Sequence, residues 1–170
     1  MTRIFLSSNT AIQYNMKQIM QLRTESNVKF TITGCTGRGA KIKIAEGTTT
    51  IPERAFKDCH WVGEIILPNS VTTIGDEAFR DCNNLISINI SKGVTTIAND
   101  AFYGCTNLTS IKLPNGLTSI GYFAFNACKN LTSINISKGV TTIGYKAKKC
   151  KRLIYSDQNI FLSDDTIFLP

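Results

Sequence analysis

The sequence predicts a solenoid of stacked short repeats, in which every repeat adds one strand to a parallel β-sheet. Consecutive units of 23 residues begin at Leu67 (LPNSVTTIGDEAFRDCNNLISIN), Ile90 (ISKGVTTIANDAFYGCTNLTSIK) and Leu113 (LPNGLTSIGYFAFNACKNLTSIN). An earlier unit begins at Ile44, and a shorter unit with Lys148 in place of phenylalanine begins at Ile136. Because no unit can bury its apolar face alone, neighbouring units must stack and share one core.

The full repeat pattern, I-P/S-x-x-V-T-x-I-G-x-x-A-F-x-x-C-x-x-L-x-x-I-x-I, closely resembles the BspA-like class of leucine-rich repeats. The resemblance covers residues 44–155. It implies a leucine-rich repeat solenoid of about five stacked 23-residue repeats with a parallel β-sheet face.

Each repeat contains one short strand whose side chains alternate between the core and the solvent. In the unit that ends near Ile90, Leu85 and Ile88 point inward, whereas Ser87 and Asn89 point outward. The paired threonines of each unit favour a second, lateral β-ladder rather than a binding site.

Two further columns predict the interior of the solenoid. They are Phe56, Phe79, Phe102 and Phe125, and Cys59, Cys82, Cys105 and Cys128. The cysteines are predicted to be buried, reduced thiols that act as small apolar side chains. Adjacent rungs are close enough for a disulfide, so distance alone does not exclude one. A line of thiols without a C-x-x-C pair is not a zinc cage, and no metal is expected.

The segments outside the repeats are expected to close the two ends of the core. Residues 1–43 form the predicted N-terminal cap, with a helix over 9–24, a strand over 28–32 and a loop from Gly34 to Gly39 that carries Cys35. The helix is predicted because Ile12, Met16, Ile19 and Met20 share one helical face. It could instead bind a partner. Residues 156–170 are expected to form a short, hairpin-like β cap.

Composition excludes several classes of protein. The chain has 170 residues, of which 42% are hydrophobic and 18% are charged, with a net charge of +7. It is too apolar for a disordered chain, and no apolar run reaches the ~20 residues that span a membrane. A single histidine argues against histidine-based metal or triad chemistry.

Catalysis finds little support in the sequence. His60 follows Cys59, but adjacent side chains of an extended segment point apart, so no cysteine–histidine pair is expected. The glycine-rich stretch from Gly34 to Gly39 lacks the lysine and hydroxyl residue of a phosphate-binding loop. The prediction is a protein without enzymatic activity, catalytic residues or a cofactor.

The outward positions of the sheet are the predicted partner-binding surface, because they are free of packing duty. They form two ladders: Lys41, Glu64, Ser87, Ser110 and Ser133, and beside them Lys43, Ile66, Asn89, Lys112 and Asn135. Short polar side chains with occasional lysines suit hydrogen bonding to another protein, including a protein of a host. An ordinary solvated sheet would have the same composition.

A basic cluster near the C-terminus supplies an alternative partner. It consists of Lys146, Lys148, Lys149, Lys151 and Arg152. The cluster resembles a short nuclear-import signal and could hold a nucleic acid or another polyanion. A solvated terminal repeat is the simpler interpretation.

The resemblance also implies a broader role. Proteins similar to the BspA-like class are typically microbial, and many act at cell surfaces in adhesion and host interaction. No signal peptide is visible in the sequence. The expectation is therefore a host-interaction protein, which is either an effector secreted by a route that does not use a signal peptide or a surface-associated protein. A cytoplasmic scaffold is the alternative.

Overall fold

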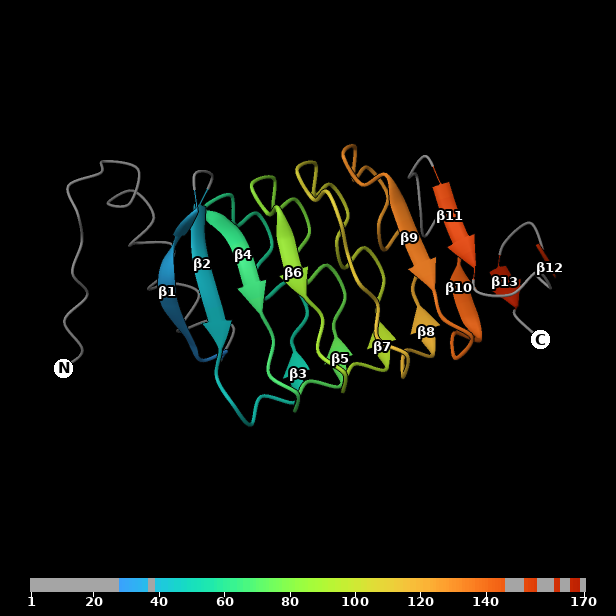
Figure 1. Ribbon diagram of the computed structural model, residues 1–170, viewed down its shortest axis with the longest axis horizontal. Coiled ribbons are helices and arrows are strands. Elements are labelled where there is room, and N and C mark those ends of the chain that lie inside the picture. The colour runs from blue at the N-terminus through green and yellow to red at the C-terminus, as the bar shows by residue number, and fades with distance from the viewer. Residues whose placement is uncertain (1–27, 37–38, 146–151, 156–160, 163–165, 169–170) are drawn as a thin grey trace.

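The chain forms a β-solenoid of about four turns, as the computed structural model shows (Figure 1). The structure describes residues 28–36, 39–145, 152–155, 161–162 and 166–168. Its strands are β1 (Phe30–Thr36), β2 (Gly39–Ile44), β3 (Thr50–Ile51), β4 (Val62–Ile66), β5 (Thr73–Ile74), β6 (Ser87–Asn89), β7 (Thr96–Ile97), β8 (Ser119–Ile120), β9 (Ser133–Ile136), β10 (Thr142–Gly144), β11 (Arg152–Tyr155), β12 (Phe161–Leu162) and β13 (Thr166–Phe168).

The longer strands lie side by side along one face of the solenoid (Figure 1). Strands β2, β4 and β6 pair in parallel, and β9 pairs in parallel with β11. Glu64 lies opposite Ser87 and Ile65 lies opposite Ile88, so the register advances by one 23-residue unit per strand. The parallel sheet predicted from the repeat is confirmed.

The paired threonines form the second ladder that the sequence predicts. Strands β3, β5, β7, β8 and β10 pair in parallel along another edge of the solenoid. The hydroxyl groups of Thr72, Thr95 and Thr118 donate hydrogen bonds to main-chain carbonyls of the preceding turn, at 3.0–3.3 Å. These threonines therefore hold neighbouring turns together.

The phenylalanine column stacks through the centre of the core. The ring centroids of Phe56, Phe79, Phe102 and Phe125 are 5.4, 5.2 and 5.4 Å apart in succession. The thiol of Cys82 lies 3.0 Å from the carbonyl oxygen of Phe56, and the next two cysteines repeat this contact. The side chains of Cys59, Cys82, Cys105 and Cys128 are buried, as predicted for this column.

Each turn around the phenylalanine contains residues with left-handed backbone. Positive φ angles recur at Arg54, Glu77, Asp100 and Phe123, and again at Asp58, Asp81, Gly104 and Ala127. Only one of these positions is glycine, although glycine adopts this conformation with least strain. The stacked neighbours hold the others there, since main-chain hydrogen bonds join each turn to the next, such as Phe56 to Ala78 at 2.7 Å.

The N-terminal end differs from the expectation in one segment. The predicted loop from Gly34 to Gly39 is wrong, because β1 extends to Thr36 and β2 begins at Gly39, and the two strands pair antiparallel. Cys35 therefore lies in a strand, opposite Ala40. A Cβ atom on Gly39 would lie 2.6 Å from the carbonyl oxygen of Trp61. Glycine is thus present here for the close approach of two strands, and not for a loop.

The remaining cap predictions have different outcomes. The predicted helix over residues 9–24 lies outside the described residues, and the part of the chain that is described contains no helix. At the other end, β12 and β13 form an antiparallel pair, and β13 pairs with β10. The predicted short C-terminal β cap is therefore present.

Charged side chains surround Glu77 on the turns of the first two complete repeats. Its carboxylate accepts hydrogen bonds from Arg54 at 2.6 Å and from Lys57 at 2.5 Å. Arg80 lies 3.7 Å from the same carboxylate and 3.6 Å from Asp100. The hydrogen bonds from Arg54 and Lys57 lower the pKa of Glu77 to about 2. The cluster links turns that are one repeat apart.

Replacing Phe102 with alanine should strongly destabilise the solenoid. The ring is fully buried between two stacked neighbours, and such a truncation costs about 3–5 kcal/mol. Denaturant unfolding measures the effect. Tyr122→Ala is the control, because that ring is 46% exposed, and an equal loss in both variants would contradict the central role of the column.

Replacing Glu77 with glutamine should lower stability at neutral pH by on the order of 1 kcal/mol, as expected for a partly screened ion-pair cluster. The pKa of Glu77 falls from 4.5 to about 2 on folding. Its contribution is therefore present above pH 4.5 and is lost as the pH falls through about 2. Denaturant unfolding at several pH values should show the wild type and Glu77→Gln converging in acid. Glu53→Gln, at an exposed carboxylate, is the control. A stability difference between the wild type and Glu77→Gln that stays constant with pH would contradict the role assigned to the Glu77 carboxylate.

Candidate functional site

The predicted binding ladders lie on the outer side of the long strands. Asn89, Lys112 and Asn135 are exposed, and the residues directly before and after each of them are buried. Lys41, Glu64, Ile66 and Ser87 are partly exposed, whereas Lys43 and Ser110 are exposed. Ser133 lies in β9, opposite Arg152. The repeat thus brings these side chains to one face, as the alternation of β-structure requires.

The face is not uniform along the solenoid. At its N-terminal end the lysines are neutralised, because Lys41 pairs with Glu64 at 2.9 Å and Lys43 pairs with Glu46 at 3.3 Å. Lys41 and Glu64 occupy adjacent rungs of one ladder. Opposite charges 23 residues apart in the sequence are the signal that predicts this pair.

The sheet is interrupted between β6 and β9. Residues 110–113 occupy the intervening turn but form no assigned strand. The last main-chain bond before them joins Thr109 to Ile86 at 3.3 Å. Among the described residues, the main chain from Ser110 to Leu113 has no hydrogen-bond partner. The single continuous sheet expected from the repeat is therefore wrong at this position.

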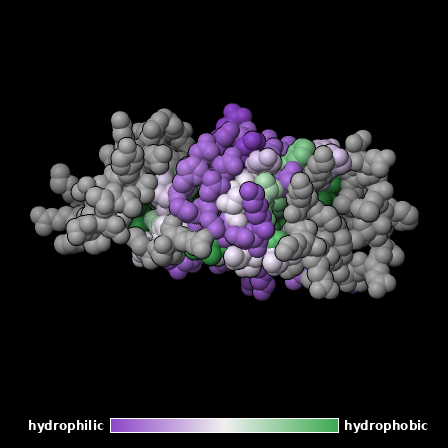
Figure 2. All heavy atoms as spheres, turned by 90° about the horizontal axis from the view of Figure 1, so that it is seen from above, coloured by the Kyte–Doolittle hydropathy of each residue, from purple (hydrophilic) through white to green (hydrophobic). Residues whose placement is uncertain are grey.

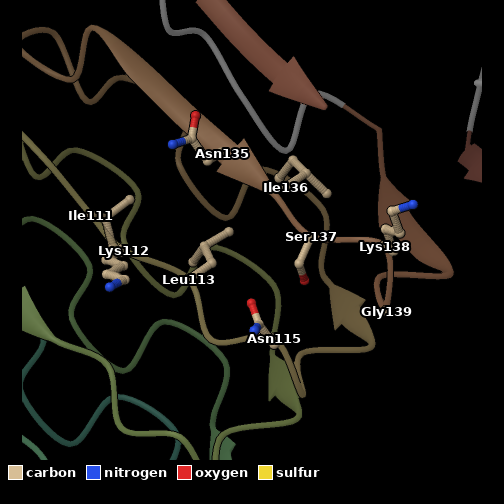
Figure 3. A pocket seen from close by; sticks show the side chains of 9 residues that line it. All are labelled: Ile111, Lys112, Leu113, Asn115, Asn135, Ile136, Ser137, Lys138 and Gly139. Atoms are coloured by element: carbon tan, nitrogen blue, oxygen red, sulfur yellow. The ribbon is translucent and has the colours of Figure 1, made fainter. Parts of the chain in front are cut away.

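A surface groove lies at this interruption, between residues 111–115 and β9 (Figure 3). Its volume is about 770 Å³, and it is lined by Ile111, Lys112, Leu113, Asn115, Asn135, Ile136, Ser137, Lys138 and Gly139. In Figure 3 the side chain of Leu113 extends from its segment toward β9. The spacing of the repeats does not predict this groove, because the repeat pattern of the sequence continues without interruption through residues 111–139.

The upper side of the molecule in Figure 1 is mostly hydrophilic over its middle (Figure 2). The turns that precede β6 and residues 110–113 carry asparagines one repeat apart. Asn84 donates a hydrogen bond to the carbonyl of His60, and Asn107 donates one to the carbonyl of Asn83 at 2.6 Å. These asparagines therefore connect neighbouring turns, which is a structural role.

The candidates for reactive chemistry lie apart from this face. Burial raises the pKa of Cys59 to about 12, and it also raises the pKa of Cys82 and Cys105. Buried thiols of this kind are poor nucleophiles. His60 is exposed on the turn beyond Cys59. Across the described ranges, no group of three or more His, Cys, Asp or Glu side chains could hold a metal ion.

The structure describes the predicted basic cluster only in part. Of the basic cluster, Lys146, Lys148, Lys149 and Lys151 lie outside the described residues, and Arg152 begins β11. No helix in the described part of the chain has the length and apolar character needed to cross a membrane.

Comparison with solved structures finds bacterial leucine-rich repeat proteins. A leucine-rich cell surface protein from Faecalibacterium prausnitzii has a TM-score of 0.63 and 27% identity, covering 79% of this chain and 40% of that one. A leucine-rich repeat protein from T. pallidum has a TM-score of 0.56 and 25% identity, covering 76% and 62%. One from Bacteroides ovatus has a TM-score of 0.57 and 31% identity, covering 75% and 39%.

These neighbours are longer than the present chain, which spans at most 62% of their length. No curated protein matches the sequence. Residues 34–154 match the family described as the BspA type leucine-rich repeat region, in six copies. This match covers most of the chain and includes the phenylalanine and cysteine columns that build the core. The chain therefore belongs to the BspA type leucine-rich repeat family.

Proposed function

We propose that this protein is a non-enzymatic interaction module that binds another protein through the outer face of β2, β4, β6 and β9. Proteins built from leucine-rich repeats are generally protein-interaction modules, and such folds are typically non-enzymatic scaffolds. The observation that carries the proposal is the pair of solvent-facing ladders on strands whose inward side chains form the core.

The ladders suit recognition because their side chains can change without disturbing the packing. The same outward position holds Ile66 in β4, Asn89 in β6 and Asn135 in β9, whereas the inward positions remain apolar in every repeat. A surface with fixed geometry and variable side chains is what repeat proteins use to bind partners.

The proposal extends to a host protein as the partner and to a secreted or surface-associated location. One of the similar structures is described as a cell surface protein, and the family resemblance points the same way. This part of the proposal depends on relatives of greater length and not on the geometry of the face.

A double substitution on the face, Asn89→Arg with Asn135→Arg, should weaken capture of a protein partner by at least about tenfold. Both side chains are exposed, so the fold should persist while charge and bulk block the surface. The measurement is affinity capture from a nuclease-treated mammalian cell extract, followed by mass spectrometry and titration of the captured protein.

The control is Thr49→Arg with Tyr122→Arg, which adds the same charge to exposed positions outside the ladders of the face. It should retain the partner. Equal capture by the face variant and the wild type would exclude the face as the binding surface. Capture that is seen with an untreated extract and is lost after nuclease treatment would favour a polyanion as the partner instead.

A further inference from the structure

The groove between residues 111–115 and β9 combines an apolar floor with polar and positive edges. Ile111, Leu113 and Ile136 line it and are 4–7% exposed. Lys112 and Asn135 are exposed at its margin. Lys138 also lines the groove. An apolar surface bordered by lysines favours a ligand that carries both apolar groups and negative charge.

The half of the solenoid that contains the groove has no negative charge of its own. No aspartate or glutamate occurs between Asp100 and Asp157. Eight ion pairs among the described residues lie within residues 41–100. In the part of the chain that the structure describes, Lys112 has no acidic partner, whereas Lys43, at the corresponding ladder position, is paired with Glu46. The positive charge of Lys112 is available to a ligand.

The main chain beside the groove can also take part in binding. The peptide groups from Ser110 to Leu113 have no hydrogen-bond partner in the described part of the structure. In a parallel sheet these groups would be paired with the neighbouring strands. An extended peptide offers the complementary donors and acceptors.

The dimensions of the face favour a peptide segment over a globular surface. Five rungs about 4.8 Å apart and three residues of about 3.3 Å each cover on the order of 200–250 Å². A standard protein interface needs about 800 Å² from each partner. A short segment bound in a groove is consistent with the smaller area.

We propose that the groove binds an extended, acidic segment of the partner protein, in which apolar side chains alternate with carboxylates. The apolar side chains contact Ile111, Leu113 and Ile136, and a carboxylate pairs with Lys112. This inference rests on the proposed function and assigns the recognised chemistry to one position on the face.

The test uses the purified full chain and fluorescein-labelled octapeptides, with binding measured by fluorescence anisotropy at physiological salt. The probe has alternating aspartate and valine. One comparison peptide has lysine in place of aspartate, and another has serine in place of valine. The probe should bind at least about tenfold more tightly than either comparison peptide.

Two substitutions test the location. Lys112→Glu reverses the charge at the margin, and Asn135→Trp fills the groove at a ladder position that accommodates Ile66 in β4. Each should weaken binding of the probe by about tenfold or more. Lys129→Glu, in the same basic half but outside the ladders, is the matched control. It should change affinity by less than about twofold. Thermal unfolding verifies that all three variants are folded.

Equal affinity for the aspartate–serine peptide would show attraction to negative charge alone and would overturn the proposal. An equal loss in Lys112→Glu and Lys129→Glu would have the same meaning. Failure of every peptide to bind, with face-dependent capture of a protein intact, would reject the groove and leave the proposed function standing. Binding of the probe in the groove without face-dependent capture would reject the proposed function instead.

Discussion

Contact between consecutive phenylalanine rings is the interaction on which the rest of the structure depends. The ring centroids of Phe79 and Phe102 are 5.2 Å apart, and both rings are fully buried. The phenylalanine of each repeat therefore packs against the phenylalanine of the next repeat in one shared core. Cys105 fills the adjacent space and lies 3.1 Å from the carbonyl oxygen of Phe79. Because ring and thiol must meet in every turn, the spacing of 23 residues is fixed by packing. Loss of one ring affects two neighbouring turns.

This packing also explains why the turns tolerate strained backbone. Glu77 and Asp81 have positive φ angles of 52° and 57°, a conformation that costs non-glycine residues energy. Their peptide groups bond to the next turn, at 2.9 Å to Asn99 and 2.7 Å to Tyr103. The hydrogen bonds and the packed core together hold the turn in this strained conformation. The outer ladders are thereby left without a structural duty, and that freedom is the physical basis of the proposed binding surface.

Most of the fold could be predicted from the sequence, because packing that repeats from turn to turn requires a residue pattern that repeats along the chain. The inward positions of the strand, the threonine ladder, the buried thiols and the closing β-hairpin follow from residue type and spacing. The predicted loop from Gly34 to Gly39 is the exception. Gly39 is needed for a close approach to Trp61, a contact with a residue distant in the chain, and no local pattern identifies such a contact.

The sequence by itself determined which side chains face the solvent, because alternation along a strand needs only the order of residues. The tertiary structure alone decided how those side chains combine. It neutralised Lys41 with Glu64 and left the main chain from Ser110 to Leu113 without a hydrogen-bond partner among the described residues. It also opened a groove beside Asn135, where the repeat itself is unbroken. The reason is that spacing fixes the position of each residue within its own turn, whereas a groove depends on the distance between turns, which the summed packing of the whole core sets.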